Sequence, residues 1–366
     1  MSHNININNS TAALSGKDQE IAQLLVQNIP TINNVGLLNG KMGISIYFFH
    51  LVRKTENSDY REVAEQLIDE VYEEVSNKQP PVDFKNGLAG IAWGLEYLVQ
   101  NKFLEADTDA VLSKVDEKIY QYLRSAEKLP IGISKGVIGF LIYILSRLKG
   151  KNIDAEDPNI FIYKRLIIRL VNRMGTLTEE RKLRLQEPLL FDLTWDLPLS
   201  LILLAKIRSM NFYNSKIDRI LECLSPVLLS LYPRSPSNRL YLLLGLQSVL
   251  QQIHIEDWDR HFGLLKKDIF LPDILRNDLT NKNIGLVNGA AGISFISRQL
   301  FSLTNDERLR FKRDDLIKKI NTSEYWQLVK EREPEKINFG LLSGLAGIGM
   351  ELLELSQKEP VSMRSV

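Results

Sequence analysis

Cysteine and histidine are scarce in this 366-residue sequence, which contains only Cys223 and the four histidines His3, His50, His254 and His261. A single cysteine forms no disulfide within the chain and cannot build a Cys-rich zinc cluster. Free thiol usage of this kind fits the reducing cytoplasm. Cys223 falls in a predicted outer helix, where we expect a buried structural thiol. We predict no metal and no cofactor.

Excess charge and long apolar runs are also missing. The formal net charge is +1, so no global feature points to a nucleic-acid partner or an anionic membrane. The longest apolar stretches, Val137–Ser146 and Leu197–Ala205, are too short to span a bilayer as helices. The polar segment Met1–Glu20 lacks the apolar core of a signal peptide. We therefore expect a cytoplasmic protein without a membrane span.

The glycines recur in a regular pattern along the sequence. Five segments carry glycine pairs spaced Gly-x-x-Gly directly before an apolar run. Their first glycines, used here as markers, are Gly40, Gly87, Gly136, Gly289 and Gly344. The long interval after Gly136 holds two degenerate copies, centred on Trp195 and Leu242, so the markers recur about every 50 residues. Trp195 and Pro198 replace both glycines of unit 4, whereas unit 5 keeps only Gly245.

Each repeat unit contains two helical patterns. After the first motif, residues 44–52 are apolar on nearly all sides, which is typical of a buried helix. Residues 60–75 then place apolar side chains at i, i+3 and i+4, which predicts an amphipathic surface helix. The sequence thus predicts an all-α toroid of seven inner and seven outer helices, with one toroid domain over 15–358. Residues 1–14 are expected to be extended or disordered, and 359–366 form a tail.

The motif residues have predicted structural roles. Glycines at i and i+3 share a helix face and allow inner helices to approach closely. The glycine preceding each pair is expected to adopt a positive φ in a tight turn. The polar residues just before the markers are expected to cap the inner helices. They are Asn39, Asn86, Thr194, Asn288 and Ser343.

A ring of Gly-x-x-Gly hairpins of this length resembles the lanthionine synthetase C-like (LanC-like) family over nearly the whole chain. The resemblance implies an α/α toroid with zinc at the mouth of the inner barrel. In family cyclases, the metal activates a cysteine thiol of a precursor peptide for addition to a dehydroamino acid. Zinc suits this step because it lowers the pKa of the thiol and holds the thiolate in place.

The residues that carry this chemistry are replaced here. The resemblance places the zinc ligands, a cysteine in unit 5 and a Cys-His pair in unit 6, at Leu240, Val287 and Asn288. A further active-site histidine of the family falls at about Thr194. Leucine and valine are not zinc ligands, and asparagine and threonine are poor ones. Zinc-dependent cyclase activity is therefore not expected, and any other enzymatic activity stays open.

The motif loops are predicted to line the mouth with polar and aromatic side chains. The candidate ligand-binding residues are Trp195, Arg239, Tyr241, Asn288, Lys41, Lys85 and Lys135. The lysines are either a cationic rim for a carboxylate or phosphate, or solvated loop charges. Trp195 is either a stacking platform or a plug that replaces glycine. The candidate catalytic residues are Asp192, Asp196 and Asp83; carboxylates near helix starts serve either acid–base chemistry or capping.

Three functions remain open from sequence. The first is a zinc-free LanC-like protein that binds or scaffolds a precursor peptide, or partners a peptide-modifying enzyme. The second is a hydrolase or lyase that uses the mouth carboxylates, an idea that rests on fold analogy. The third is a thioether cyclase that activates its thiol without zinc.

Overall fold

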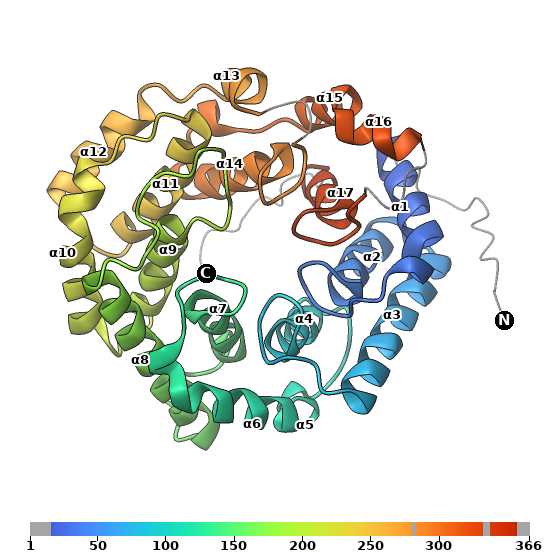
Figure 1. Ribbon diagram of the computed structural model, residues 1–366, viewed down its shortest axis with the longest axis horizontal. Helices are drawn as coiled ribbons and strands as arrows, with labels where there is room; N and C mark the ends of the chain where they lie inside the picture. The colour runs from blue at the N-terminus through green and yellow to red at the C-terminus, as the bar shows by residue number, and fades with distance from the viewer. Residues whose placement is uncertain (1–15, 280–282, 332–336, 357–366) are drawn as a thin grey trace.

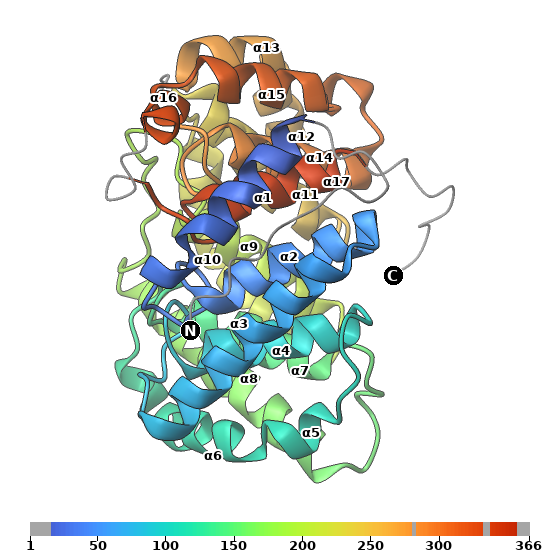
Figure 2. The ribbon, with the colours of Figure 1, turned by 90° about the vertical axis from the view of Figure 1, so that its right-hand side faces the viewer.

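The computed structural model describes residues 16–279, 283–331 and 337–356, and these form an all-α toroid (Figures 1 and 2). The inner helices are α2 (Lys41–Thr55), α4 (Leu88–Gln100), α7 (Val137–Leu148), α9 (Asp196–Arg208), α11 (Pro236–Leu250), α14 (Ala290–Thr304) and α17 (Leu345–Glu354). Each contacts the next, and α17 contacts α2, so the inner layer is a closed ring. The toroid predicted from the glycine repeat is confirmed.

The outer layer surrounds this ring (Figure 1). Four of its positions hold single helices: α1 (Gly16–Asn28), α3 (Ser58–Asn77), α8 (Pro158–Glu179) and α10 (Asn214–Ser230). The other three are broken into two: α5 (Thr108–Val111) with α6 (Ser113–Tyr122), α12 (Glu256–Lys266) with α13 (Leu271–Asp273), and α15 (Arg313–Thr322) with α16 (Glu324–Lys330). Short 3-10 turns lie at Ile29–Thr31, Leu123–Lys128 and Glu307–Leu309, and a π turn at Ile274–Asp278. The outer layer is thus less regular than the predicted set of single helices.

Burial follows the predicted patterns with one exception. Helix α2 is buried on almost every side, and α3 buries Tyr60, Val63, Leu67 and Val71. Tyr72, which the spacing places on the same face, is 70% exposed. The predicted N-terminal segment and C-terminal tail lie outside the described residues, so these domain boundaries stay predictions.

The two ends of the described chain meet, as a closed ring requires. Helix α1 packs on α17, and α17 packs on α2. The carboxylate of Asp18 in α1, 1% exposed, accepts hydrogen bonds from Lys54 at 2.9 Å and from Arg313 at 3.0 Å. This buried group ties the first outer helix to α2 and α15.

The motif glycines work differently from the prediction. The N-caps of α2, α4, α7, α14 and α17 are the marker glycines themselves, in extended backbone and without a side-chain cap. The predicted capping role of Asn39, Asn86, Asn288 and Ser343 is therefore wrong, because these residues stand one position too early. In unit 4 the N-cap is Trp195, so Thr194 does not cap α9.

Close packing explains why glycine occupies the motif positions, but the packing partner is a motif loop and not another inner helix. A Cβ on Gly87 would lie within 3.0 Å of the Pro81–Asp83 backbone of its own motif loop. A Cβ on Gly43 would lie 2.8 Å from the Leu341 side chain of the neighbouring unit. The glycines that precede the pairs do not have a positive φ; among described glycines only Gly150 does. The expected positive-φ turn is therefore wrong, and steric room is the reason for glycine.

Units 4 and 5 start their inner helices differently. Helix α11 begins at Pro236, after the N-cap Ser235, whose hydroxyl accepts a hydrogen bond from the Asn238 backbone. Arg239 and Tyr241 therefore lie within the first turns of α11 and not in a loop. Gly245 of this helix faces Pro198 of α9, where an added Cβ would lie 3.1 Å from the proline Cα. Among the motif glycines of the described residues, Gly245 is the one whose contact fits the predicted close packing of two inner helices.

Candidate functional site: the motif loops at the mouth

Backbone hydrogen bonds join the motif loops into a belt at the N-terminal ends of the inner helices. We call this belt the loop ladder. Each rung runs from the N–H of the residue two positions before one marker to the carbonyl at the same position of another unit. The rungs are Leu193 to Val287 (2.7 Å), Val287 to Leu342 (3.0 Å), Leu342 to Leu38 (2.8 Å), Leu38 to Lys85 (3.0 Å) and Lys85 to Ser134 (3.2 Å).

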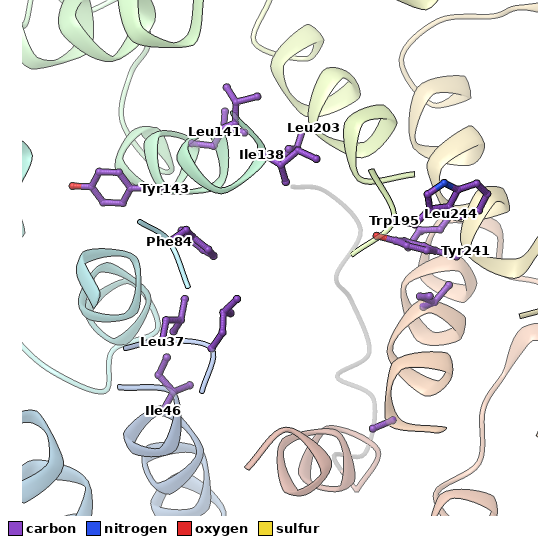
Figure 3. Packing of buried hydrophobic residues seen from close by; sticks show 14 of the residues in the cluster. Leu37, Ile46, Phe84, Ile138, Leu141, Tyr143, Trp195, Leu203, Tyr241 and Leu244 are labelled. Carbon is purple, nitrogen blue, oxygen red and sulfur yellow. The ribbon is translucent and has the colours of Figure 1, made fainter. Parts of the chain in front are cut away.

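Side-chain packing follows the same order. The residue three positions before a marker, or four positions before it in unit 4, lies against the second glycine of the pair in the unit that its loop is bonded to. An added Cβ would meet that side chain at 2.7–3.0 Å in each case. The pairs are Phe191 with Gly292, Leu286 with Gly347, Leu341 with Gly43, Leu37 with Gly90, and Phe84 with Gly139. Leu37 and Phe84 appear together beside α2 and α4 in Figure 3.

Both series of contacts skip unit 5. Leu193 and Phe191 of unit 4 reach directly to Val287 and Gly292 of unit 6, because the unit 5 position is occupied by the first turn of α11. The long α8–α9 connection covers that turn. In it, Glu187 accepts hydrogen bonds from the backbone N–H groups of Arg234 and Ser235 at 2.7 and 2.8 Å.

The ladder is also open between units 3 and 4. By analogy with the other rungs, the Ser134 N–H should donate to the carbonyl of Leu193. That carbonyl instead accepts the Tyr241 hydroxyl at 2.8 Å, and the Ser134 N–H makes no hydrogen bond within the described residues. The helices beneath, α7 and α9, still touch. The opening therefore belongs to the loops and not to the helical wall.

Arg184 organises the unit 4 loop, and sequence reasoning missed it. Its guanidinium donates to Asp192 at 3.0 Å and to the Thr194 carbonyl at 2.6 Å. Its backbone N–H donates to Asp196 at 3.2 Å, and its carbonyl accepts the Trp195 indole N–H at 2.8 Å. Nothing in the local sequence singles out Arg184, because these partners lie 8–12 residues further along the chain.

The two unit 4 carboxylates are engaged within their own loop. One oxygen of Asp192 accepts both the Thr194 N–H and hydroxyl, at 2.8 and 2.6 Å, and the other binds Arg184. Asp196 is 8% exposed, and burial raises the pKa of its carboxyl, opposed by the hydrogen bond from Arg184. Asp83 is 8% exposed and accepts the Asn86 backbone N–H at 2.8 Å in loop 2, away from the unit 4 pair.

The aromatic candidates are packed. Trp195 is fully buried and Tyr241 is 1% exposed, and both lie in the interior beside α9 and α11 (Figure 3). The Tyr241 ring stands edge-on to Phe191, with ring centroids 6.4 Å apart. Arg239 is separate from this group; its guanidinium lies over Tyr232, 4.4 Å from the ring centroid.

The remaining mouth candidates do not converge on one point. Lys41 pairs with Glu70 of α3. The side chains of Lys85, Lys135 and Asn288 make no hydrogen bond or ion pair with the described residues, and Lys135 and Asn288 are exposed. The structure thus brings together Asp192, Trp195, Asp196 and Tyr241 and leaves the lysines spread along the ladder.

A titratable cluster lies at the opposite end of the inner helices. His50 is 7% exposed, and its Nε2 is 2.8 Å from the Tyr97 hydroxyl. Its Nδ1 is 3.7 Å from Glu354, which in turn pairs with Arg298 at 3.5 Å. Burial, and then the charge of Arg53, lowers the pKa of His50 to about 4. Burial raises the pKa of Glu354.

No metal-binding group emerges from the described part of the chain. It contains no cluster of three or more His, Cys, Asp or Glu side chains that could hold an ion. Cys223 in α10 is exposed, so the expected buried thiol is wrong; it lies on the solvent face of this amphipathic helix. None of the described helices is long and apolar enough to cross a membrane.

The two helical layers and the loop ladder define an α/α toroid. Residues 31–189, which include the first three motifs, match the family model described as lanthionine synthetase C-like protein. The toroid is similar to the solved structure of nisin cyclase, with a TM-score of 0.68 and 15% identity over 92% of this chain and 93% of that chain. A search of curated proteins by sequence matches none. The first part of the chain is thus similar to the LanC-like family in sequence, and the toroid is similar to nisin cyclase in fold.

Proposed function

We propose that this chain is a LanC-like toroid that binds peptide in ribosomal peptide modification, as a scaffold for a precursor peptide or a partner of a modifying enzyme, and does not perform zinc-dependent cyclisation. One observation carries the proposal. The unit 4 loop, where the resemblance places the further histidine, is bonded directly to the unit 6 loop, where it places two zinc ligands, from Leu193 to Val287 at 2.7 Å. Leu240, at the assigned cysteine position, is fully buried in α11.

The surrounding packing supports the same conclusion. Phe191 and Tyr241 fill the space between units 4, 5 and 6, and Tyr241 bonds to the carbonyl of Leu193. A catalytic zinc site keeps an open coordination position for water or substrate. Leucine, valine and two aromatic rings at this place supply neither ligands nor that opening, whereas the seven-unit ring and its polar mouth are kept.

Two measurements test the proposal. Protein dialysed against zinc and then analysed by inductively coupled plasma mass spectrometry should contain far less than one equivalent. With a peptide carrying one cysteine and one dehydroalanine, it should not accelerate thioether formation, in parallel with a zinc-loaded family cyclase as the positive control. One bound equivalent of zinc, or catalysed ring closure, overturns the proposal.

Peptide binding is tested separately. The immobilised protein is used to select from a displayed library of random 12-residue peptides, and enriched sequences are resynthesised and titrated. Enrichment of peptides with micromolar affinity is expected. A selection that enriches nothing over the same matrix carrying an unrelated all-α protein refutes the binding role.

A further inference from the structure

The break in the loop ladder between units 3 and 4 leaves open space beside one motif glycine, Gly132. Where two ladder loops meet, the glycine that precedes the pair packs against the backbone of the polar residue just before the marker of the next loop. This holds at three such joints: Gly36 with Asn86, Gly340 with Asn39, and Gly285 with Ser343. An added Cβ would approach these backbones to 3.2 Å or less. Gly132 holds the same motif position in unit 3, yet an added Cβ there would meet no atom within 4 Å.

An unpaired backbone donor lies two residues beyond this open glycine. The Ser134 carbonyl is bonded to Lys85, whereas the Ser134 N–H has no partner within the described residues. The N–H groups at this motif position in the other five ladder loops each donate to the backbone carbonyl of another loop. A segment that filled this break would therefore be extended. It would place one carbonyl at the Ser134 N–H and a small polar residue against Gly132.

Cationic side chains flank the joint. The C-terminal part of α8 reaches it, because Arg173 donates to the Leu129 carbonyl at 2.9 Å at the start of loop 3. Exposed cations on the two sides are Lys128, Lys135, Arg181, Lys182 and Arg184. Lys182 is paired with Glu180 and Arg184 with Asp192.

The other three cations make no ion pair within the described residues. Two carboxylates in the same segments, Glu127 and Glu179, offset two of these three charges, so one positive charge remains in excess. The excess that remains favours a segment with acidic side chains.

We propose that the opening between loops 3 and 4 is a docking site for an extended, acidic segment of a partner peptide, which completes the ladder by accepting a hydrogen bond from the Ser134 N–H. Addition of an extended segment to open backbone groups is an established mode of peptide recognition, in which main-chain bonds supply affinity and the flanking side chains supply specificity. The inference rests on the proposed peptide-binding function and assigns that binding to one place.

The test uses a probe copied from the chain itself. Residues 340–344, Gly-Leu-Leu-Ser-Gly, fill the equivalent place at another joint. A fluorescein-labelled peptide that carries this sequence between two Asp-Glu pairs is titrated with the full chain by fluorescence anisotropy. The same peptide with Lys-Lys pairs in place of Asp-Glu is the charge control and should bind more weakly.

Two variants with matched controls locate the binding. Gly132→Leu fills the open space and should raise the Kd of the acidic probe by about tenfold or more. Gly263→Leu is its control, because a Cβ on Gly263 in α12 also meets nothing within 4 Å. Lys135→Glu should weaken binding as well, whereas Lys114→Glu, at an exposed position of α6, should not. Unchanged thermal midpoints show that each variant is folded.

The outcomes separate this inference from the proposed function. If the probe binds and Gly132→Leu behaves like Gly263→Leu, the docking site is elsewhere and this inference fails, while peptide binding stands. If the probe does not bind at about 1 mM, this inference fails. The proposed function is then decided by the library selection, which does not depend on the probe sequence.

Discussion

Replacing Gly36 by alanine tests whether the loop ladder holds the mouth together. The new Cβ would lie 2.8 and 2.9 Å from the carbonyl carbon and oxygen of Asn86, closer than real Cβ contacts occur. Loops 1 and 2 must separate, and the 3.0 Å hydrogen bond from Leu38 to Lys85 is then lost or stretched. Forced overpacking costs about 1–3 kcal/mol and the lost hydrogen bond about 1 kcal/mol. We expect the free energy of unfolding to fall by about 2–4 kcal/mol.

Gly132→Ala is the matched variant, since Gly132 has the same motif position, open space and no positive φ. There the methyl group should stabilise the chain by about 0.4–1 kcal/mol by restricting the unfolded state. With an unfolding entropy of about 2.1 cal/mol/K per residue, the expected shifts in Tm are about −4 °C for Gly36→Ala and +1 °C for Gly132→Ala. Calorimetry of both variants in one buffer measures them. Equal shifts, or no loss in Gly36→Ala, refute the ladder as a stabilising element.

Three further perturbations follow from buried groups. Because the pKa of His50 is lowered to about 4, the unfolded chain, with a histidine pKa near 6.5, takes up the proton more readily. Stability should fall between about pH 6.5 and 4 by up to ~3 kcal/mol, and His50→Gln should flatten this fall in urea titrations. Arg147→Ala leaves buried Glu96 without its 2.5 Å partner and should cost about 3–5 kcal/mol in the same assay, whereas Arg147→Lys should cost less. Trp195→Phe removes the indole N–H that donates to Arg184 and should cost about 1–3 kcal/mol; an unchanged urea midpoint contradicts that role.

The ring was predictable from sequence because its signals are local. Each intact motif places two glycines and an apolar run within about ten residues, and their recurrence specifies the closed repeat. The start of α11 carried a local signal as well: Ser235 followed by Pro236 is a common N-cap and first helical residue. The regular spacing of the other motifs instead predicts a loop at Arg239 and Tyr241, which the structure contradicts.

The candidate site was less predictable because its contacts are not local. Arg184 holds Asp192, Asp196 and Trp195, yet it stands in an irregular connection where no periodicity marks it. The capping prediction failed for another reason. Asparagine before a glycine suggests a side-chain cap, but crowding from the motif loop moves the helix start to the glycine itself. Residue preference was outweighed by steric contact that only the folded loop reveals.

The buried position that the resemblance assigns to zinc and the open joint have one geometric origin. The inner ring still contains seven helices in contact, so its circumference is that of seven units. Only six loops contribute to the ladder, because α11 begins at Pro236, about two turns earlier than its marker predicts, and supplies no loop. Five rungs then join six loops, and one joint must stay open. Leu193 bonds to Val287 and Tyr241, so the opening falls between units 4 and 3, at Ser134. The same shift that buries Leu240 thus leaves the Ser134 N–H without a partner among the described residues, which links the replaced zinc-ligand position to the proposed docking edge.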